Sequence, residues 1–400
     1  MTMELSRIKE AADRFGTPLY LFDLDCIRDR VQRFRDAFKG EIGLTYSMKT
    51  NPFLTLEMSR QVERIEVCSM GEFRICRDLE IPAEKLYISG VLKIRDDLME
   101  ILEYGQDTAR YTAESPLQLK MLSEWADAHE KTLRIYPRLT NDSQFGMDED
   151  TILGLIKDRK NYPHIEFAGI HFFSGTQKKK LKKHEKELAM LDAFFERLHE
   201  EAQFEVPELE YGTGFAVSYF EDQKKKEEDL RDPEHLEMFR RMVQDMKWKG
   251  IVTIKMGRAY AAECGCYVTT ALDIKENNGN AICLVDGGIH QLNYDGQIEG
   301  MYRPQMAVIP ADEPCERAQK DWSIYGSLCT MNDLLCRSFP ETIGLGDRVV
   351  FFKTGAYSFY EGMSLFLSHE LPAVVLFGEK DGFIRARDQI QSYTFNMAKY

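Results

Sequence analysis

An α/β fold is predicted for this chain: a closed (β/α)8 barrel of the TIM type and a β-rich C-terminal domain that also takes a strand from the N-terminus. First, the 400 residues exceed what one hydrophobic core usually organises, which favours two domains. Second, eight short β-rich segments recur through the first two-thirds of the chain, each followed by a helix-periodic stretch, as expected for parallel β/α units. Third, strand patterns replace this alternation after about residue 262.

The predicted elements follow one another in a regular order. Residues 1–16 have helical periodicity, and the apolar segment around Tyr20 is assigned to the β domain because eight barrel strands follow it. Those strands are predicted at 44–50, 64–69, 86–90, 110–115, 133–139, 167–173, 209–214 and 252–257. The chemistry of such a barrel lies on the loops at the C-terminal ends of its strands. Five chemically notable residues fall at such ends: Lys49, Arg138, Phe173, Gly212 and Arg258.

The barrel domain is predicted to span residues 26–262, and the β domain to consist of residues 1–25 and 263–400. Within the β domain, residues 267–288 contain two strand patterns around an Asn-Gly pair, which is the sequence signal of a hairpin. Further strand patterns lie at 346–357 and 373–377. We find no repeat, low-complexity tract or long linker.

Composition and charge exclude several classes of function. No apolar run approaches the roughly 20 residues of a membrane span, so no membrane segment is expected. The net charge of −14 repels nucleic-acid phosphate, so no nucleic-acid partner is expected. The N-terminus lacks the apolar stretch of a signal peptide, and nine scattered cysteines indicate reduced thiols. Both observations favour the cytoplasm.

Two local clusters were less informative. Cys264 and Cys266 lie close together, but no His or second cysteine pair completes a ligand set, so no metal site is predicted. The lysine-rich run from Lys178 to Lys186 is most often a solvated helix start. It is also a candidate docking patch for an acidic partner.

Lys49 is the candidate nucleophile. It ends an apolar strand, where a barrel would hold its amine in a partly dry pocket. Desolvation disfavours the ammonium form of a lysine and frees the amine to react with an aldehyde. A strand-end lysine alone is usually a surface residue, so the assignment depends on the motifs that accompany it.

Seven further motifs follow Lys49 in a consistent order. Lys49 itself lies in the motif Tyr-x-x-Lys-x-Asn, and the seven motifs that follow are EVCSMGE, PRLTNDSQFGM, GIHFFSGTQ, EYGTGFAV, MGR, LCTMND and TGAY. Together they resemble the fold-type III pyridoxal-phosphate enzymes, the family of alanine racemase and of ornithine and diaminopimelate decarboxylases. The resemblance runs from about Tyr20 to about His369.

This resemblance implies pyridoxal 5'-phosphate as cofactor, held by Lys49 as a Schiff base. Glycine-rich loops suit its phosphate because glycine permits both the turn and the close approach of backbone amides. A ring at position 173 is implied to pack on the pyridine face, whereas His171 is predicted to be structural. The implied cofactor-binding residues are Lys49, Glu66, Arg138, Phe173, Gly212, Gly214, Lys255, Gly257, Arg258 and Tyr357.

The family's active site lies at a dimer interface, so the resemblance also implies a homodimer with shared sites. Cys329, from the partner subunit, is the implied catalytic proton donor to the substrate carbon, since a neutral thiol can donate a proton. Thr330 and Asp333 are the implied substrate residues. The alternatives are an ordinary buried cysteine at position 329 and a space-filling tyrosine at position 357.

Lys255 is the largest departure from the family pattern. Decarboxylating relatives carry a carboxylate here, which keeps the pyridine nitrogen protonated. A lysine would repel a second cation, so the ring nitrogen is expected to be neutral and the ring a weaker electron sink. Decarboxylation remains the leading hypothesis. The alternatives are an amino-acid racemase or epimerase and a catalytically inactive homologue that acts as a binding protein.

Thr330 is the second departure, because diaminopimelate-type enzymes have Glu directly after the cysteine. Residues 285–296 also lack the arginine that follows Asp-Gly-Gly in those enzymes. A capped or carrier-linked amino acid is therefore favoured over a simple diamino acid. In this respect the chain resembles the secondary-metabolism branch, which acts on carrier-linked aminoacyl groups or siderophore precursors. Carrier proteins are acidic, which would give the lysine run a purpose.

Overall fold

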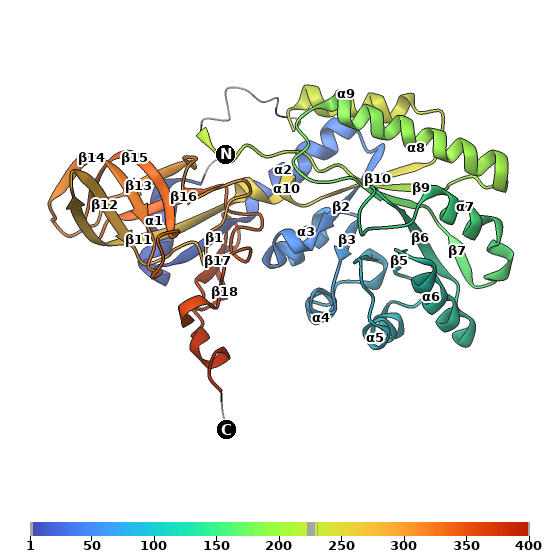
Figure 1. Ribbon diagram of the computed structural model, residues 1–400, viewed down its shortest axis with the longest axis horizontal. Helices are drawn as coiled ribbons and strands as arrows, with labels where there is room; N and C mark the ends of the chain where they lie inside the picture. Colours follow the sequence, from blue (N-terminus) through green and yellow to red (C-terminus); the bar gives the residue numbers. More distant parts are fainter. Residues whose placement is uncertain (1–2, 222–228, 230, 399–400) are drawn as a thin grey trace. The chain divides into compact units, whose positions relative to one another are not determined.

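The computed structural model describes residues 3–221, 229 and 231–398. The chain divides into two compact units, drawn in Figure 1. A barrel unit consists of Val31–Ala216 and Glu228–Ala259, and a β unit consists of Met1–Arg30, Val217–Glu227 and Tyr260–Tyr400. Each unit is described by itself.

The barrel unit contains eight parallel strands in a closed ring, as the sequence predicts. Neighbouring strands pair in the order β5-β4-β3-β2-β10-β9-β8-β6, and pairing of β5 with β6 closes the ring. The strands are β2 (Ile42–Ser47), β3 (Arg64–Val67), β4 (Leu86–Ile88), β5 (Arg110–Ala113), β6 (Leu133–Leu139), β8 (Ile170–Phe173), β9 (Glu208–Gly212) and β10 (Ile251–Met256). All eight segments predicted from the sequence therefore overlap a barrel strand.

The sixth predicted segment, 167–173, is divided. A short strand, β7 (Ile165–Phe167), pairs with the start of β6, and β8 pairs with its end. Gly169 lies between them, and a side chain there would collide with the carbonyl oxygen of Glu208 and the ring of Tyr136. The break therefore lets the strand approach β9 closely.

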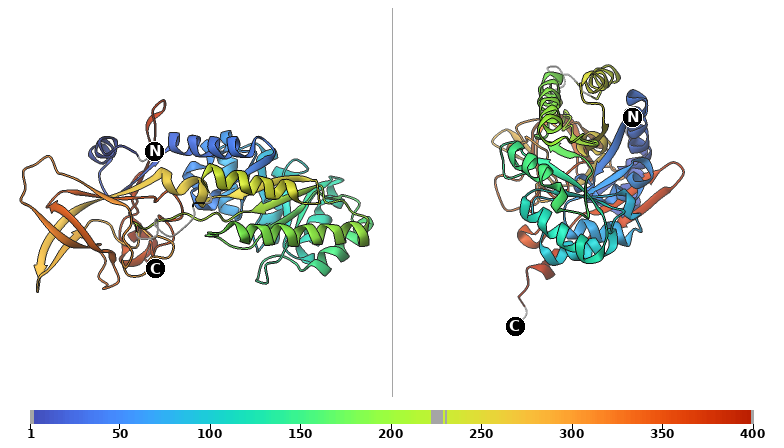
Figure 2. Two further views of the ribbon diagram at one scale, coloured as in Figure 1. Left: turned by 90° about the horizontal axis from the view of Figure 1, so that it is seen from above. Right: turned by 90° about the vertical axis from the view of Figure 1, so that its right-hand side faces the viewer.

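Helices surround the ring, as the right-hand view of Figure 2 shows. Several begin at a residue whose side chain accepts a hydrogen bond from a first-turn amide, which stabilises a helix start: Ser69 before α4, Ser115 before α6 and Asp148 before α7. The helices of this region are α2 (Leu24–Phe38), α3 (Thr55–Gln61), α4 (Met70–Asp78), α5 (Arg95–Gly105), α6 (Pro116–His129), α7 (Glu149–Lys157), α8 (Leu181–Ala202), α9 (Pro233–Asp245) and α10 (Arg258–Ala261).

The β unit is built on one sheet in the order β15-β14-β12-β11-β1-β17-β18, with β16 pairing to β11 and β13 to β16. The strands are β1 (Leu19–Asp23), β11 (Gly265–Asn277), β12 (Asn280–Val285), β13 (Met306–Ile309), β14 (Arg317–Tyr325), β15 (Leu334–Gly344), β16 (Arg348–Phe352), β17 (Ala373–Gly378) and β18 (Gly382–Arg387). The prediction that the N-terminal strand joins this unit is confirmed, because β1 lies between β11 and β17.

The predicted hairpin is β11 and β12, and its turn residues Asn278 and Gly279 both have positive φ, as a tight hairpin turn requires. The helix α1 (Leu5–Phe15) packs Ile8, Ala11 and Ala12 into the apolar core of this unit. Four strands, β13, β14, β15 and β18, have no counterpart in the sequence prediction.

Val217–Glu227 belongs to the β unit, whereas the predicted barrel domain, residues 26–262, includes it. Its described part is held there by polar contacts: Lys353 Nζ donates to the Ser218 carbonyl, and Arg303 pairs with Glu221. None of the described helices has both the length and the apolar character needed to span a bilayer.

Candidate active site

Lys49 lies at the C-terminal end of β2, in the single turn Met48–Thr50. Its side chain is 42% exposed, and its Nζ lies 3.3 Å from Glu66 Oε2 and 3.5 Å from Cys68 Sγ. Burial raises the pKa of the Cys68 thiol to about 12, so this neighbour is neutral. The amine is thus accessible and faces one carboxylate.

Glu66 is shared between two lysines inside the barrel. Lys255 Nζ donates to its Oε1 over 2.6 Å and lies 2.9 Å from His171 Nε2. Glu66, Lys255 and His171 come from β3, β10 and β8, and all three are buried. Barrel closure therefore assembles one buried cluster from three separate strands.

Opposing effects set the charges in this cluster. Burial opposes ionisation of Glu66, but Lys255 and Lys49 outweigh it and hold the pKa of the carboxyl well below its usual value. Burial lowers the pKa of Lys255 while Glu66 raises it, and the net direction is down. Burial and then Lys255 push the pKa of His171 well below its usual value, so the imidazole is neutral.

Arg138, at the end of β6, is fixed by a carboxylate. Its Nη1 donates to Glu114 Oε1 over 2.9 Å, and Glu114 Oε2 accepts from the Gly146 amide over 3.0 Å. The guanidinium carbon also lies 4.4 Å from the centre of the Phe145 ring. Arg138 Nε is buried and has no hydrogen-bond partner among the described residues.

Phe173 ends β8 beside the glycine-rich loop that follows β9. A side chain at position 212 would collide with the Phe173 ring, and one at position 214 would collide with the Gly175 carbonyl. Gly214 also has a φ of +59°, in the left-handed region that glycine adopts most readily. Both glycines are therefore needed for the close packing of this loop.

Thr213, between these glycines, is fully buried, and its hydroxyl finds no hydrogen-bond partner among the residues that the structure describes. On the next strand, a side chain at position 257 would collide with Thr50. Arg258 follows and is also buried. Strands β9 and β10 are adjacent, so these two loops lie on neighbouring strand ends.

Lys178 is buried beneath the same loop, although the sequence groups it with exposed lysines. Its Nζ donates to Glu187 Oε2 over 2.6 Å and to the Gly212 carbonyl over 3.4 Å. Glu187 also accepts a hydrogen bond from the Tyr211 hydroxyl. Burial lowers the pKa of Lys178 to about 8. Lys178 therefore stabilises the glycine-rich loop and is not part of the exposed basic surface.

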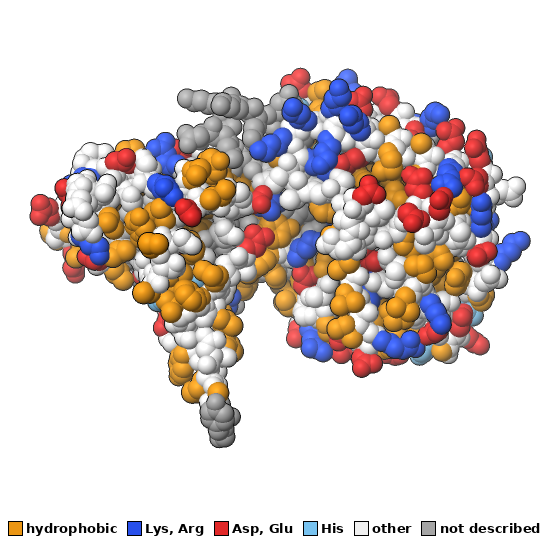
Figure 3. All heavy atoms as spheres, viewed as in Figure 1, with side chains coloured by type: hydrophobic (Ala, Val, Ile, Leu, Met, Phe, Trp, Pro, Cys, Tyr) orange, Lys and Arg blue, Asp and Glu red, His pale blue; other side chains and the backbone are white. Residues whose placement is uncertain are grey.

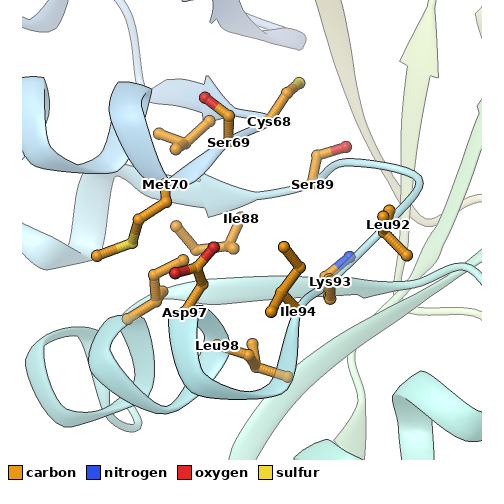
Figure 4. A pocket seen from close by; sticks show the side chains of 12 residues that line it. Cys68, Ser69, Met70, Ile88, Ser89, Leu92, Lys93, Ile94, Asp97 and Leu98 are labelled. Carbon is orange, nitrogen blue, oxygen red and sulfur yellow. The ribbon is translucent and has the colours of Figure 1, made fainter. Parts of the chain in front are cut away.

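A small pocket of about 160 Å³ opens at the ends of β3 and β4, next to the starts of α4 and α5, and is drawn in Figure 4. Cys68, whose thiol lies 3.5 Å from Lys49 Nζ, is one of the residues that line it. Lys93, on its rim, donates to the Gly90 carbonyl, Thr112 and Gln118, each over 3.1 Å. All three hydrogens of that amine are used, so Lys93 anchors its loop.

The remaining predicted site residues, Cys329, Thr330, Asp333 and Tyr357, lie in the β unit. Cys329 is exposed in the connection between β14 and β15. The carboxylate of Asp333, which is buried, accepts from the amides of Leu328 and Ile289 over 2.6 and 2.7 Å. Burial nevertheless raises its pKa. Asp333 thus holds the turn that carries Cys329 and Thr330.

Tyr357 is partly buried and has a φ of +66°. A left-handed backbone is unusual for a bulky residue, and such strain clusters at functional sites. The cofactor-binding role of Tyr357 stays a prediction.

The barrel residues fit a phosphorylated pyridine aldehyde. An accessible amine, Lys49, would meet the aldehyde, and the buried Thr213 hydroxyl and Arg258 would hold the phosphate. Phe173 provides an apolar ring face, and an ammonium group, Lys255, can donate to a neutral ring nitrogen. The described residues contain no group of three or more His, Cys, Asp or Glu side chains placed to bind a metal ion.

Sequence reasoning missed some members of this site. His171 was assigned a structural role, yet it contacts Lys255, and Glu114 and Cys68 were not singled out. All three lie in or directly after barrel strands, and this position was the available signal.

Comparison with known proteins identifies relatives along nearly the whole chain. Residues 24–262 match the family described as "Pyridoxal-dependent decarboxylase, pyridoxal binding domain". The L-glutamyl-[BtrI acyl-carrier protein] decarboxylase of Niallia circulans is 27% identical, over 94% of this chain and 92% of that protein. A diaminopimelate decarboxylase of Aquifex aeolicus is 24% identical, over 88% of this chain and 84% of that protein.

Two further similarities are to another decarboxylase and to a solved structure. The 2-[(L-alanin-3-ylcarbamoyl)methyl]-2-hydroxybutanedioate decarboxylase of Staphylococcus aureus is 25% identical, over 89% of this chain and 93% of that protein. The crystal structure of a diaminopimelate decarboxylase from M. jannaschii superimposes with a TM-score of 0.81 at 21% identity, covering 98% of this chain and 94% of the other. That structure supports the predicted fold.

Proposed function

The chain belongs to the pyridoxal-dependent decarboxylase family, and we propose that it decarboxylates a capped or carrier-linked amino acid, with pyridoxal phosphate held as a Schiff base on Lys49. One observation carries this proposal: the Lys49 amine is exposed beside a buried carboxylate. Lys178 and Lys255 are instead buried, and the amine of Lys93 donates to three acceptors.

Different residues of the barrel bind and orient the cofactor. When bound, pyridoxal phosphate withdraws electrons from the bonds to the substrate's α-carbon. Thr213 and Arg258 would hold its phosphate, and Phe173 would offer an apolar face to its ring. Glu66 pairs with the amines of both Lys49 and Lys255.

Cys329 of a second subunit supplies the proton that replaces the carboxylate. Asp333 supports this role, because it fixes the turn on which Cys329 is exposed and Thr330 is half-buried. The active form is therefore a homodimer with shared sites. All nine cysteines are free, which agrees with a reducing compartment such as the cytoplasm.

The substrate class follows from Thr330 and from two relatives. Thr330 offers no carboxylate to a distal ammonium group, which disfavours a free diamino acid. The Niallia circulans relative acts on a glutamyl group linked to a carrier protein, and the Staphylococcus aureus relative acts on an acylated alanine derivative. A secondary-metabolism role fits both.

A second candidate is an amino-acid racemase or epimerase, and Lys255 is the observation that favours it. An ammonium group paired to Glu66 would face the ring nitrogen and leave it neutral, so that the ring withdraws electrons less strongly. Retention of Lys49, Arg258, Cys329 and Tyr357 disfavours the third candidate, an inactive binding protein.

Incubation in deuterium oxide with the substrates of these relatives distinguishes the candidates. A decarboxylase releases carbon dioxide and leaves one deuterium on the product carbon. A racemase exchanges the α-hydrogen of unchanged substrate and releases no carbon dioxide, and this outcome would replace the leading proposal. Mass spectrometry of product and substrate measures both.

Mixing two inactive variants tests the shared site. We expect Cys329→Ala to lower kcat by about 10²-fold or more with little change in KM. A mixture of Cys329→Ala and Lys49→Ala, unfolded and refolded together, should regain about a quarter of wild-type activity, because half of the dimers then carry one intact site. Cys283→Ala, at a buried cysteine of the same unit, is the control. No recovery on mixing would contradict the shared site.

A further inference from the structure

Five lysines occupy the start of α8 and the residues just before it. We call Lys179, Lys180, Lys182, Lys183 and Lys186 the α8 lysine face; all five are exposed. The opposite side of the same segment is buried through Leu181, His184 and Leu188. Lys and Arg side chains gather at the top of the view in Figure 3, over α8 and α9. The exposed lysines are therefore held in place because the other side of the same segment is packed against the barrel unit.

This arrangement is unfavourable for the helix itself. A helix N-terminus carries a partial positive charge that favours acidic and disfavours basic side chains. The first turn of α8 has no acidic residue, and Lys180 at its N-cap makes no side-chain capping bond. The starts of α5 and α7 instead carry Asp96 and Asp97, and Glu149 and Asp150. When a helix start departs from this charge preference without a compensating contact, the departure indicates a functional reason for the lysines.

The charges of four lysines of this face are not neutralised by the residues that the structure describes. Lys180, Lys182, Lys183 and Lys186 form no ion pair with any residue that the structure describes. Glu185 is the acidic residue between them, and Glu187 is committed to the buried Lys178. Unpaired cations at this density attract an anionic surface over the distance of a Debye length, roughly 10 Å at moderate salt.

The lysine face is joined to the barrel mouth. The Lys178 amide donates to the Gly214 carbonyl over 2.8 Å, and the Ala216 amide donates to the Lys178 carbonyl over 3.2 Å. The segment therefore begins on the glycine-rich loop, and α8 starts at the rim where the C-terminal ends of the strands lie. Any partner bound to this face sits beside the active-site opening.

We propose that the α8 lysine face docks an acidic carrier protein that presents its tethered substrate to the barrel mouth. This inference rests on the proposed function and names its partner class. Charge complementarity carries it: a chain of net charge −14 repels an acidic protein over most of its surface, so a local basic face selects both the partner and its orientation.

Binding of the holo form of the BtrI acyl-carrier protein, the carrier named for the Niallia circulans relative, tests this proposal. Fluorescence anisotropy of the labelled carrier is followed as cofactor-loaded, full-length enzyme is added, at low and at physiological ionic strength. We expect binding that weakens with salt. We expect K182E/K183E/K186E to raise Kd by at least about tenfold, because each reversal turns attraction into repulsion.

The matched control is K120E/K131E/K157E, which makes the same change of charge on exposed lysines elsewhere on the barrel unit. It should change Kd by less than about twofold. Equal effects of the two triple variants, or no salt-sensitive binding by the wild type, would overturn the proposal. Equal competition by anionic phospholipid vesicles or duplex DNA would also overturn it, because the face would then bind polyanions in general.

Failure of this proposal is distinguishable from failure of the proposed function. Docking is measured without turnover, whereas the proposed function is measured as carbon dioxide release. If the enzyme releases carbon dioxide but binds no carrier, only the docking proposal is wrong. If the protein binds the carrier through these lysines but releases no carbon dioxide, the docking proposal holds and the proposed reaction is wrong.

Discussion

Lys49→Ala is expected to abolish covalent cofactor binding and to lower activity by roughly 10³-fold or more, as the loss of a covalent nucleophile does. The reason is structural: Lys93, Lys178 and Lys255 are engaged by acceptors within the barrel, so none can replace it. The covalent attachment is measured as an absorbance band near the edge of the visible range after addition of pyridoxal phosphate. Borohydride treatment should remove this band.

Lys49→Arg separates charge from covalent chemistry. The guanidinium keeps a positive charge near Glu66, which lies 3.3 Å from the wild-type amine. A guanidinium does not form a Schiff base. We expect this variant to retain the stability of the wild type and to lose the absorbance band. If Lys49→Ala keeps a borohydride-sensitive band, another amine carries the cofactor and the assignment of Lys49 is wrong.

Glu66→Ala is expected to lower the free energy of unfolding by about 3–5 kcal/mol, since removal of one partner leaves a buried charge uncompensated. Lys255 donates to Glu66 over 2.6 Å and is buried. Urea unfolding at neutral pH, followed by circular dichroism, measures the change. The exposed pair Arg95–Glu124 provides the control, because Glu124→Ala should cost less than about 1 kcal/mol.

The pH dependence of this effect has a defined sign. Although burial opposes it, Lys255 and Lys49 hold the pKa of Glu66 below its ordinary value of 4.5. A carboxyl with a lowered folded pKa stabilises the protein above its unfolded pKa, and this stabilisation is lost as the pH falls through the folded value. The difference between wild type and Glu66→Ala should therefore shrink as the pH falls below about 4.5.

Replacing both partners provides a second control. Glu66→Leu combined with Lys255→Met removes both charges and keeps their volume, so its cost should be much smaller than that of Glu66→Ala. If Glu66→Ala unfolds at the wild-type urea concentration, or if the double variant is no more stable than the single one, the buried pair is not the source of the stability.

The barrel was predictable because its signals are local. Each strand needs only a few apolar residues, and each is followed by a helix-periodic stretch and a turn, so all eight strands were located from the chain alone. The hairpin at Asn278 and Gly279 was predictable for the same reason, since its turn demands residues that accept positive φ. The divided strand at Gly169 and the long pair β14 and β15 were not, because their pairing depends on distant backbone.

The sequence by itself determined which residues stand at the ends of the barrel strands, and Lys49, Arg138, Gly212 and Arg258 follow from that. Only the tertiary structure decided their partners. Glu66 and Lys255 are 189 residues apart, and Lys255 and His171 are 84 apart. Closure of the sheet brings them within hydrogen-bond distance, and the low dielectric of the interior then fixes their charges. For the same reason, only the fold separated the buried Lys178 from the exposed lysines that follow it.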